Sequence, residues 1–464
     1  AGDRPRRSGS LVWFRRDLRL GDHPALAAAA DHNHRVLGVF VADDVPLDAS
    51  GSPRRAVLAR TLAALAQAMD GRLLIAHGRP RSVLPRLARA VDADVVHVSA
   101  DYGPYGRRRD EQVQRALQDA GVEWVATGSP YAVAPGRVRK SNGERYAVFT
   151  PYYRGWTDHG WRKPARSGSA VDWVDPGEVD GIAAHDPQEY ARTVPAGMSL
   201  PEVGEQAALD GWRTFRDEAL DDYDGDRDRP DRPGTSHMSV HLKWGSIHPR
   251  TLLADLAGRR STGAASYRRE LAWREFYADS VFHLPESVWT SVDPVIDRMA
   301  WDSGQPAEER FEAWRAGRTG YPFIDAGMRQ LLAEGWMHNR LRMATASFLI
   351  KDLHLPWQRG AEHFLEHLVD GDYASNNHGW QWVAGSGAQA APFFRIFNPL
   401  TQGEKFDPSG DFVRRYIPEL RDVPGRKVHR PWELDGGVPA GYPEPIVDHA
   451  DERAEALRRW QQRG

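Results

Sequence analysis

The chain has 464 residues, of which 41% are hydrophobic and 27% charged, with a net charge of −3 and no cysteine. This length exceeds one ordinary hydrophobic core, so two or more domains are expected. The composition is typical of a globular protein, and the absence of cysteine excludes disulfides, thiolate metal sites and a cysteine nucleophile. We expect a cytoplasmic protein without a membrane span, because the longest apolar run, Pro24–Ala30, is far shorter than the roughly 20 residues that cross a bilayer.

Short apolar runs alternate with helix-like segments over residues 1–130. The expected strands are Leu11–Phe14, Val36–Val41, Arg72–Ala76, Asp94–Val98 and Glu123–Ala126, and the expected helices are Pro24–Ala30, Arg54–Met69, Ser82–Ala90 and Arg107–Ala120. The alternation predicts an α/β domain with a parallel, Rossmann-like sheet, whose ligands would lie at the carboxyl ends of the strands. Asp22 is predicted to cap the helix that starts at Pro24.

Residues 131–200 are predicted to form a connector, because Gly, Pro, Ser and Asp interrupt any periodicity there. Residues 201–464 are predicted to form an all-α domain, and the acidic run Asp221–Asp231 is expected to be disordered. Apolar positions at helical spacing mark Glu205–Leu220, Pro249–Ala257, Ser266–Phe282, Ala307–Arg315, Tyr321–Glu334, Asn339–Leu353, Arg359–Leu368 and Asp448–Arg463.

Two polar groupings could bind a ligand. Gly234–Ser239 offers three hydroxyls ahead of a helical region, a pattern that suits phosphate binding but equally an ordinary Ser/Thr N-cap. Glu270, Trp273 and Arg274 share one face of a predicted helix. They could line a cavity for a flat polar group, or form an ion pair with core packing. His338 has no companion at metal-ligand spacing, so no metal site is expected.

The densest grouping is Asp370–Trp382, with two carboxylates, three carboxamides and two indoles in thirteen residues. It suits a nitrogen-rich ligand held inside the fold, whereas the alternative is a polar surface loop with two anchoring aromatic residues. Asp370 is the candidate partner for Arg342, which needs a counter-charge if it is buried. Spacing alone does not link Trp301, Trp357 and Trp380, which could be independent core residues.

Four long motifs resemble the photolyase/cryptochrome family, specifically its microbial class I cyclobutane pyrimidine dimer photolyases. They are Val12–Asp22, Thr319–Arg329, Gly335–Ser347 and Phe393–Phe406, in the order of the family. The resemblance implies an N-terminal antenna domain and a helical domain that holds a folded FAD. Excited reduced flavin would pass an electron to the pyrimidine dimer, the cyclobutane ring would split, and the electron would return.

The resemblance assigns FAD contacts by position, with the hydroxyls at the diphosphate and the Arg342–Asp370 pair beside the flavin ring. The full set is Tyr223, Thr235, Ser236, His237, Met238, Ser239, Arg342, Asp370, Gly371, Asp372 and Asn376. Asn376 is expected at flavin N5, where an amide can accept a hydrogen bond from a protonated N5 without adding negative charge. Plant cryptochromes carry an acid there, so Asn376 favours repair over signalling.

The resemblance also implies a cavity for a flipped-out pyrimidine dimer in damaged DNA. The expected substrate contacts are Arg232, Glu270, Trp273, Arg274, Asn339, Met343, Trp382 and Gln402, of which Glu270, Asn339, Met343 and Trp382, with Asn376, are the catalytic candidates. Glu270 would hydrogen-bond the bases, and Arg232 and Gln402 could contact phosphates. The (6-4) photoproduct branch uses paired histidines in this cavity, so Asn339 and Met343 indicate the cyclobutane dimer instead.

Trp380, Trp357 and Trp301 correspond to the family's chain of electron carriers to the flavin. An antenna pigment is also implied: the loop Asp101–Asp110 is similar to that of relatives that bind 8-hydroxy-5-deazaflavin, with 5,10-methenyltetrahydrofolate as the alternative. The antenna candidates are Gly38, Phe40, Arg54 and Asp101, although Arg54 could be only a solvated helix charge.

The predicted activity is that of a monomeric deoxyribodipyrimidine photo-lyase. The rival from another class is a cryptochrome-like photoreceptor that signals through partners. A nicotinamide-dependent oxidoreductase is disfavoured because Trp13–Asp17 stands where a Gly-x-Gly-x-x-Gly turn would follow the first strand. His378 occupies a position at which many relatives have glycine.

Overall fold

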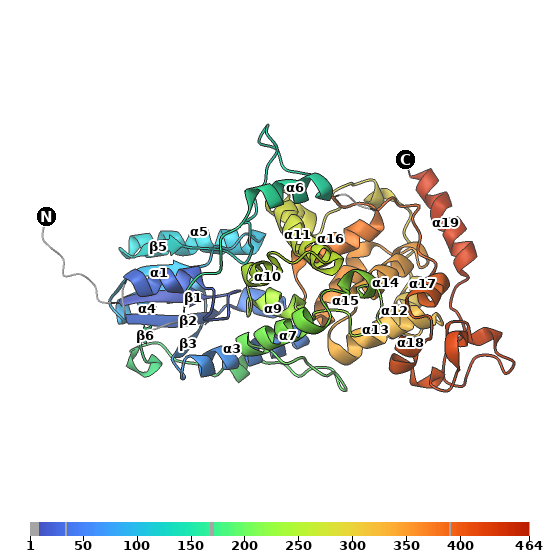
Figure 1. Cartoon of the computed structure of the whole chain (residues 1–464), viewed down its shortest axis with the longest axis horizontal. Coiled ribbons are helices and arrows are strands. Elements are labelled where there is room, and N and C mark those ends of the chain that lie inside the picture. The colour runs from blue at the N-terminus through green and yellow to red at the C-terminus, as the bar shows by residue number, and fades with distance from the viewer. Residues whose placement is uncertain (1–8, 33–34, 168–170, 389–390, 464) are drawn as a thin grey trace, which may run out of the picture.

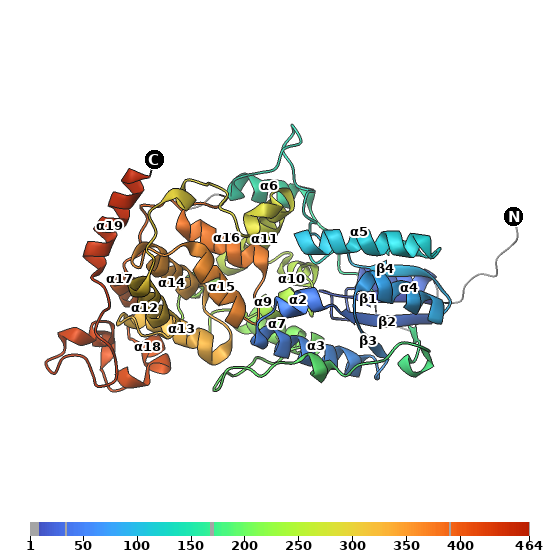
Figure 2. The same ribbon diagram turned by 180° about the vertical axis from the view of Figure 1, so that it is seen from behind.

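The computed structural model describes residues 9–32, 35–167, 171–388 and 391–463. A six-stranded sheet lies at one end of the molecule, and helices fill the rest (Figures 1 and 2). The order β3-β2-β1-β4-β5, all parallel, is the doubly wound arrangement predicted from the alternating sequence. The fold class is therefore confirmed: an α/β N-terminal domain precedes a helical C-terminal region.

Helices cover both faces of the sheet, and successive side chains of a strand point to opposite faces. In β1, Leu11 and Trp13 pack with α4 and α5, whereas Val12 and Phe14 pack with α1 and α3. The elements of this part are β1 (Gly9–Phe14), α1 (Pro24–His32), β2 (Arg35–Ala42), α2 (Asp44–Asp48), α3 (Ser52–Ala68), β3 (Leu73–His77), α4 (Pro80–Ala90), β4 (Ala93–Val98), α5 (Pro104–Asp119) and β5 (Glu123–Ala126).

The connector is more ordered than its sequence suggests. Helix α6 (Phe149–His159) places Phe149, Tyr152 and Trp156 in a core cluster of the helical region. The short strand β6 (Asp172–Trp173) pairs with the start of β2. The connector therefore contacts both parts of the molecule.

Helices account for the regular structure after β6 in the described residues. They are α7 (Glu205–Glu218), α8 (Tyr223–Asp226), α9 (Ser239–Trp244), α10 (Pro249–Leu256), α11 (Thr262–His283), α12 (Gln305–Arg315), α13 (Pro322–Glu334), α14 (Asn339–Lys351), α15 (Trp357–His367), α16 (Tyr373–Ala384), α17 (Pro399–Phe406), α18 (Asp411–Tyr416) and α19 (His449–Gln462), with 3₁₀ turns between them. Two clusters form their core: one gathers α6, α7, α10 and α11, and the other α12 to α19.

Three sequence expectations are wrong. Asp22 does not cap α1: His23 Nδ1 accepts from Leu26 N, while Asp22 accepts from Arg250 and from the backbone of Ala165. The acidic run at 221–231 is folded, since it contains α8. The surface-loop interpretation of residues 370–382 fails, because they form most of α16, whose first turn is capped by Asp372.

Candidate flavin and substrate site

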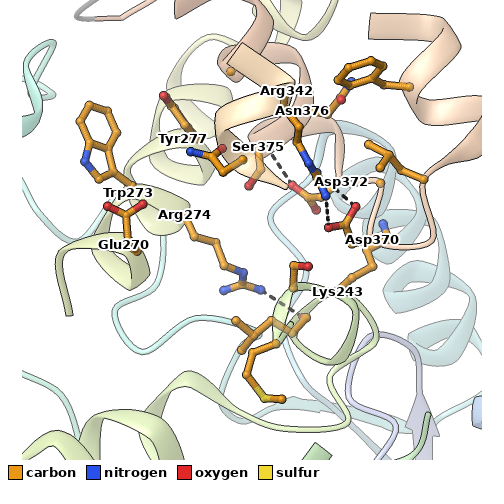
Figure 3. Close-up of a pocket in the computed structure, with 18 of the residues that line it drawn as sticks. Lys243, Glu270, Trp273, Arg274, Tyr277, Arg342, Asp370, Asp372, Ser375 and Asn376 are labelled. Atoms are coloured by element: carbon orange, nitrogen blue, oxygen red, sulfur yellow. Dashed lines mark hydrogen bonds and ion pairs between the residues drawn. The ribbon is translucent and has the colours of Figure 1, made fainter. Parts of the chain in front are cut away.

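A cavity of about 470 Å³ opens among α8, α9, α11, α14, α15 and α16, a volume within the range of ligand sites. Its lining includes five cationic side chains and three carboxylates. The excess of positive charge suits an anionic ligand. Figure 3 shows Glu270 and Trp273 on one side of this pocket and Arg342, Asp370 and Asp372 on the opposite side.

Most of the predicted flavin and substrate residues line this one cavity. They are Tyr223, Ser236, Met238, Ser239, Glu270, Trp273, Arg274, Asn339, Arg342, Met343, Asp370, Gly371, Asp372, Asn376, Trp380 and Trp382. The lining does not include Thr235, His237, Arg232, Gln402, Trp301 or Trp357. Four segments that lie between residues 223 and 382 of the chain thus meet at one site.

The segment 234–239 lines the cavity with Ser236 and Ser239 but not with Thr235. Ser236 Oγ lies 2.8 Å from the Tyr267 hydroxyl, and Ser239 Oγ accepts from Trp336 Nε1 at 3.3 Å. The N-cap interpretation is wrong, because Met238 occupies the N-cap of α9 and no side chain caps it. His237, at φ 53°, turns the chain just before α9, and its ring lies 4.2 Å from that of Trp336.

Two ion pairs lie in the lining of the cavity. Arg342 donates to the two carboxylate oxygens of Asp370, from Nη2 at 2.7 Å and from Nη1 at 3.3 Å. This is the partner that the sequence predicted. Arg16, which follows β1, donates to Asp372 at 2.9 Å. Burial alone would raise the pKa of Asp372, but Arg16, Lys243 and Arg274 lower it below its usual range. Asp372 is therefore an anion under physiological conditions.

Asn376 has a defined orientation. Its Nδ2 donates to the backbone oxygen of Ala361 at 3.1 Å and to Asn377 Oδ1 at 2.9 Å. Both amide protons are thus engaged, which leaves Oδ1 as an acceptor on a residue that lines the cavity. An acceptor of this kind is what a protonated ring nitrogen requires.

Glu270 is paired with a residue that the sequence analysis missed. Arg227 Nη2 lies 2.7 Å from Glu270 Oε1. Burial raises the pKa of Glu270, and Arg227 opposes this increase. The carboxyl group therefore retains a tendency to protonate, which allows it either to accept or to donate a hydrogen bond.

The two neighbours of Glu270 on α11 differ from expectation. Trp273 stacks on Phe149 with ring centroids 3.8 Å apart, so one face of its indole is already covered. Arg274 donates to the backbone oxygens of Pro130 and Leu242 and lies over the Tyr131 ring. Its guanidinium holds the connector against α9, and the predicted DNA contact of Arg274 gains no support.

The two predicted phosphate contacts lie outside the cavity lining. Arg232 is half exposed and pairs with Asp226 at 2.7 Å. Gln402 lies on α17, and its Oε1 is buried without a hydrogen-bond partner in the described structure. Neither arrangement identifies a DNA contact, so both assignments stay predictions.

Trp380 lines the cavity and packs against the first turn of α15. A Cβ placed on Gly360 would approach the Trp380 ring to 2.0 Å, so only glycine permits this contact. Trp357 begins the same helix and donates from Nε1 to Ser291 Oγ at 2.9 Å. Trp301 is half buried against the same core cluster. Trp314, which the sequence analysis did not single out, also contacts Trp380, at a centroid distance of 6.0 Å.

The antenna candidates lie in packed surroundings. A Cβ on Gly38 would meet Met69, Trp173 and Phe14 within 3.3 Å, and Phe40 is half buried beside the α3 face of the sheet. Asp101 pairs with Arg109 at 3.0 Å. Burial would raise the pKa of Asp101, but Arg109, Arg15 and Arg16 lower it to about 2.

Arg54 is not a solvated helix charge. Its guanidinium is buried and donates to the backbone oxygen of Leu365 on α15. Burial lowers the pKa of Arg54, and the negative charges of Asp370 and Asp372 partly offset this. Arg54 therefore joins the sheet domain to α15.

The ring of His378 is buried and packed. It lies 1% exposed beside Tyr277, at a centroid distance of 5.7 Å, and its Nε2 is 2.9 Å from Ser287 Oγ. Burial, followed by the charge of Arg145, lowers the pKa of His378 to about 4. The ring is therefore neutral at physiological pH and links α16 to the turn after α11.

Six polar residues of the lining were not assigned: Arg16, Arg227, Lys243, Tyr267, Tyr277 and Ser375. A signal existed for Arg16, because it is the second residue after β1 and ligands of such sheets lie at the carboxyl ends of strands. The others come from helices that pack together only in three dimensions, and no sequence spacing joins them.

Comparison with known proteins is consistent with this geometry. Residues 10–168 match the family model described as DNA photolyase, and residues 267–462 match that of the FAD binding domain of DNA photolyase. The chain is 39% identical to the deoxyribodipyrimidine photo-lyase of Escherichia coli, over 96% of this chain and 97% of that protein. The chain belongs to the DNA photolyase family.

Solved structures extend the likeness to three dimensions. A bacterial class III photolyase from Agrobacterium tumefaciens has 36% sequence identity and a TM-score of 0.89, covering 99% of this chain and 98% of the other. An archaeal photolyase from Sulfolobus tokodaii, solved with two FAD molecules, has 28% identity and a TM-score of 0.82, covering 98% of this chain and all of the other. The expected class I membership stays a prediction. No helix of the described residues is long and apolar enough to cross a membrane.

Proposed function

We propose that this chain repairs cyclobutane pyrimidine dimers in DNA with blue light, using FAD in the cavity described above. The observation that carries the proposal is the meeting of Glu270, Asn339, Met343, Asn376 and Trp382 with the Arg342–Asp370 pair around one cavity. When bound, photoexcited reduced FAD would supply the electron that opens the cyclobutane ring.

The residues present fit that cofactor. Ser236, in the loop before α9, and Ser239, the first residue of α9, offer hydroxyls, and Arg342 offers a cation held by Asp370. Asn376 offers a free carbonyl oxygen, since both its amide protons are bound elsewhere. Asp372, held anionic by Arg16 and Lys243, would accept hydroxyl or N–H donors of the flavin nucleotide.

The substrate side would be formed by Glu270 and its neighbours. Arg227 holds the Glu270 carboxylate in place, so one oxygen stays available to base N–H groups. Asn339 lies at the exposed start of α14, with its amide 3.7 Å from Met343 Sδ, and together they offer one polar and one soft apolar contact. Trp382, half buried on α16, offers a flat surface to a base. Trp301, Trp357 and Trp380 would carry electrons to oxidised flavin.

The finer assignments belong to the same proposal. The substrate is the cyclobutane dimer instead of the (6-4) photoproduct, the enzyme acts as a monomer, and 8-hydroxy-5-deazaflavin is the antenna. The charges of Asp101 and Arg54 act on Lys243 of the cavity lining, which supports an antenna close to the flavin. Release of the pigment by denaturation, followed by its absorption spectrum, would identify it; a folate spectrum would contradict the deazaflavin assignment.

The test of repair uses an oligonucleotide with one cyclobutane thymine dimer. Protein loaded with reduced FAD should restore the intact thymines under blue light and leave the dimer unchanged in darkness. Equal loss of the dimer in both conditions would contradict a light-driven reaction, and no loss in either would favour a signalling photoreceptor.

A further inference from the structure

A second polar cluster lies on the face of α15 that turns away from the flavin cavity. His363, Glu366 and His367 each offer a ligand atom, and these atoms lie within 4.8 Å of one another. They are the only such group of three among the described residues. Phe364 and Leu368, the neighbours of His363 and His367 in sequence, line the flavin cavity instead.

The spacing follows from helix geometry. Residues three and four apart share one face of an α-helix, so His363 and His367 lie one turn apart with Glu366 beside them. Their rings are 4.4 Å apart between centroids. Two imidazoles at i and i+4 with a nearby carboxylate form a donor set that suits zinc and similar divalent transition metals.

The His367 ring is already oriented as a ligand. Its Nδ1 lies 3.0 Å from the backbone oxygen of His363 and must donate to it. Nε2 of the neutral ring is then the nitrogen with the free lone pair. A hydrogen bond from the second ring nitrogen to a carbonyl is the usual support of a metal-bound histidine.

His363 provides an independent sign of a missing partner. Its side chain is 4% exposed, and its Nε2 has no hydrogen-bond partner in the described part of the chain. A buried polar atom of this kind is costly unless a ligand satisfies it. Burial, followed by His367 and Arg315, lowers the pKa of His363 to about 2, so the ring is neutral.

Arg315 of α12 already supplies a positive charge at this cluster. Its Nε donates to His363 Nδ1 at 3.2 Å, and its Nη2 lies 3.9 Å from Glu366 Oε2. A metal at Nδ1 would take the lone pair that Arg315 uses. A metal at Nε2 would require the ring proton to move to Nδ1, which also ends that hydrogen bond. Glu312, 2.8 Å from Arg315 Nη1, is the carboxylate to which the displaced guanidinium would stay bound.

We propose that His363, Glu366 and His367 bind one divalent transition-metal ion of the zinc class, in competition with Arg315. This revises the expectation, drawn from His338 alone, that the chain has no metal site. All three ligands lie on α15, whose Leu365 oxygen receives Arg54 of the sheet domain and whose Phe364 lines the flavin cavity, so the ion would brace this helix.

The test is titration of the full-length, FAD-loaded chain with Zn²⁺ by calorimetry, after removal of any affinity tag. Wild type should bind one ion, and Glu366→Gln and His367→Gln should each weaken that binding about tenfold or more. Both positions are at least partly exposed, so the folded state should survive, and the FAD absorbance per chain will verify it. Arg315→Gln should strengthen binding.

The matched control is His185→Gln, which removes another solvent-accessible histidine that pairs with a glutamate four residues on, Glu189. It should leave Zn²⁺ binding unchanged. Binding that persists unaltered in both Glu366→Gln and His367→Gln would overturn the proposal, as would equal weakening in His185→Gln. Weaker Zn²⁺ binding in Arg315→Gln would show that the guanidinium supports the ion. This result would contradict the proposed competition between Arg315 and the metal ion.

Discussion

At the scale of single residues, the charge of Lys243 depends on pH close to neutrality. This lysine is half buried in the lining, and burial, followed by the repulsion of Arg16, lowers its pKa to about 7. It is therefore a cation at pH 6 and largely neutral at pH 8. An anionic ligand that raises this pKa on binding must take up a proton above pH 7.

We therefore expect the affinity of the apoprotein for oxidised FAD to be highest below pH 7 and to fall above it. The fall can reach, but not exceed, about tenfold per pH unit for one coupled proton. Lys243→Met should bind more weakly at pH 6 and lose most of this dependence. Equilibrium dialysis from pH 6 to 9 measures both proteins, and parallel slopes would exclude Lys243 as the coupled group.

At the scale of elements, Gly360 sets how closely α15 and α16 approach at Trp380. The sequence predicted α15 from its periodicity but treated α16 only as a polar grouping, because Asn and Gly at 376–379 are poor helix formers. Tertiary packing overrides that propensity: α16 is capped by Asp372 and held by Asn377 and Gln381, whose amides donate to the backbone oxygens of Val288 and Ser287.

Gly360→Ala should displace the Trp380 ring, since the added Cβ would lie 2.0 Å from it. Overpacking of this kind costs about 1–3 kcal/mol of stability. Photoreduction of oxidised FAD should also slow, because Trp380 is the proposed last electron carrier. Denaturant unfolding and blue-light bleaching of the flavin band check the two effects. Gly225→Ala, on a helix where a Cβ meets open space, should leave both unchanged.

The role of Trp357 has its own test. Trp357→Phe should block photoreduction of oxidised FAD yet spare repair by chemically reduced enzyme, because the flavin then needs no electron from the protein. Trp212→Phe, a buried tryptophan in the other core cluster, serves as the control. Loss of repair in chemically reduced Trp357→Phe would mean that the residue supports the fold or the substrate site.

At the scale of the whole molecule, the sheet domain and the helical region both contribute residues to the cavity or to its support. Arg16 from the end of β1 reaches Asp372, and Arg54 from α3 reaches the end of α15. Alternation of strands and helices predicted the sheet and the resemblance predicted its helical partner. Neither predicted these cross-domain contacts, because they depend on how the two parts pack and not on any local period.

Arg16→Gln should weaken FAD binding about tenfold, since it removes one charge-assisted hydrogen bond to a buried carboxylate. It should also leave Asp372 less well compensated and thus raise its pKa. The control is Arg35→Gln, on β2 of the same sheet, which breaks a surface ion pair with Glu178. This variant should bind FAD normally. Comparable FAD loss in both variants would indicate general destabilisation of the sheet domain.

The most direct measurement of the central proposal is repair of two oligonucleotides that differ only in the lesion. Under blue light, reduced wild-type enzyme should repair the cyclobutane thymine dimer and leave the (6-4) photoproduct intact. Glu270→Gln should retain FAD but repair the dimer more slowly, with a control at the exposed Glu362 unaffected. Repair of the (6-4) lesion, or undiminished repair by Glu270→Gln, would contradict the proposed substrate site.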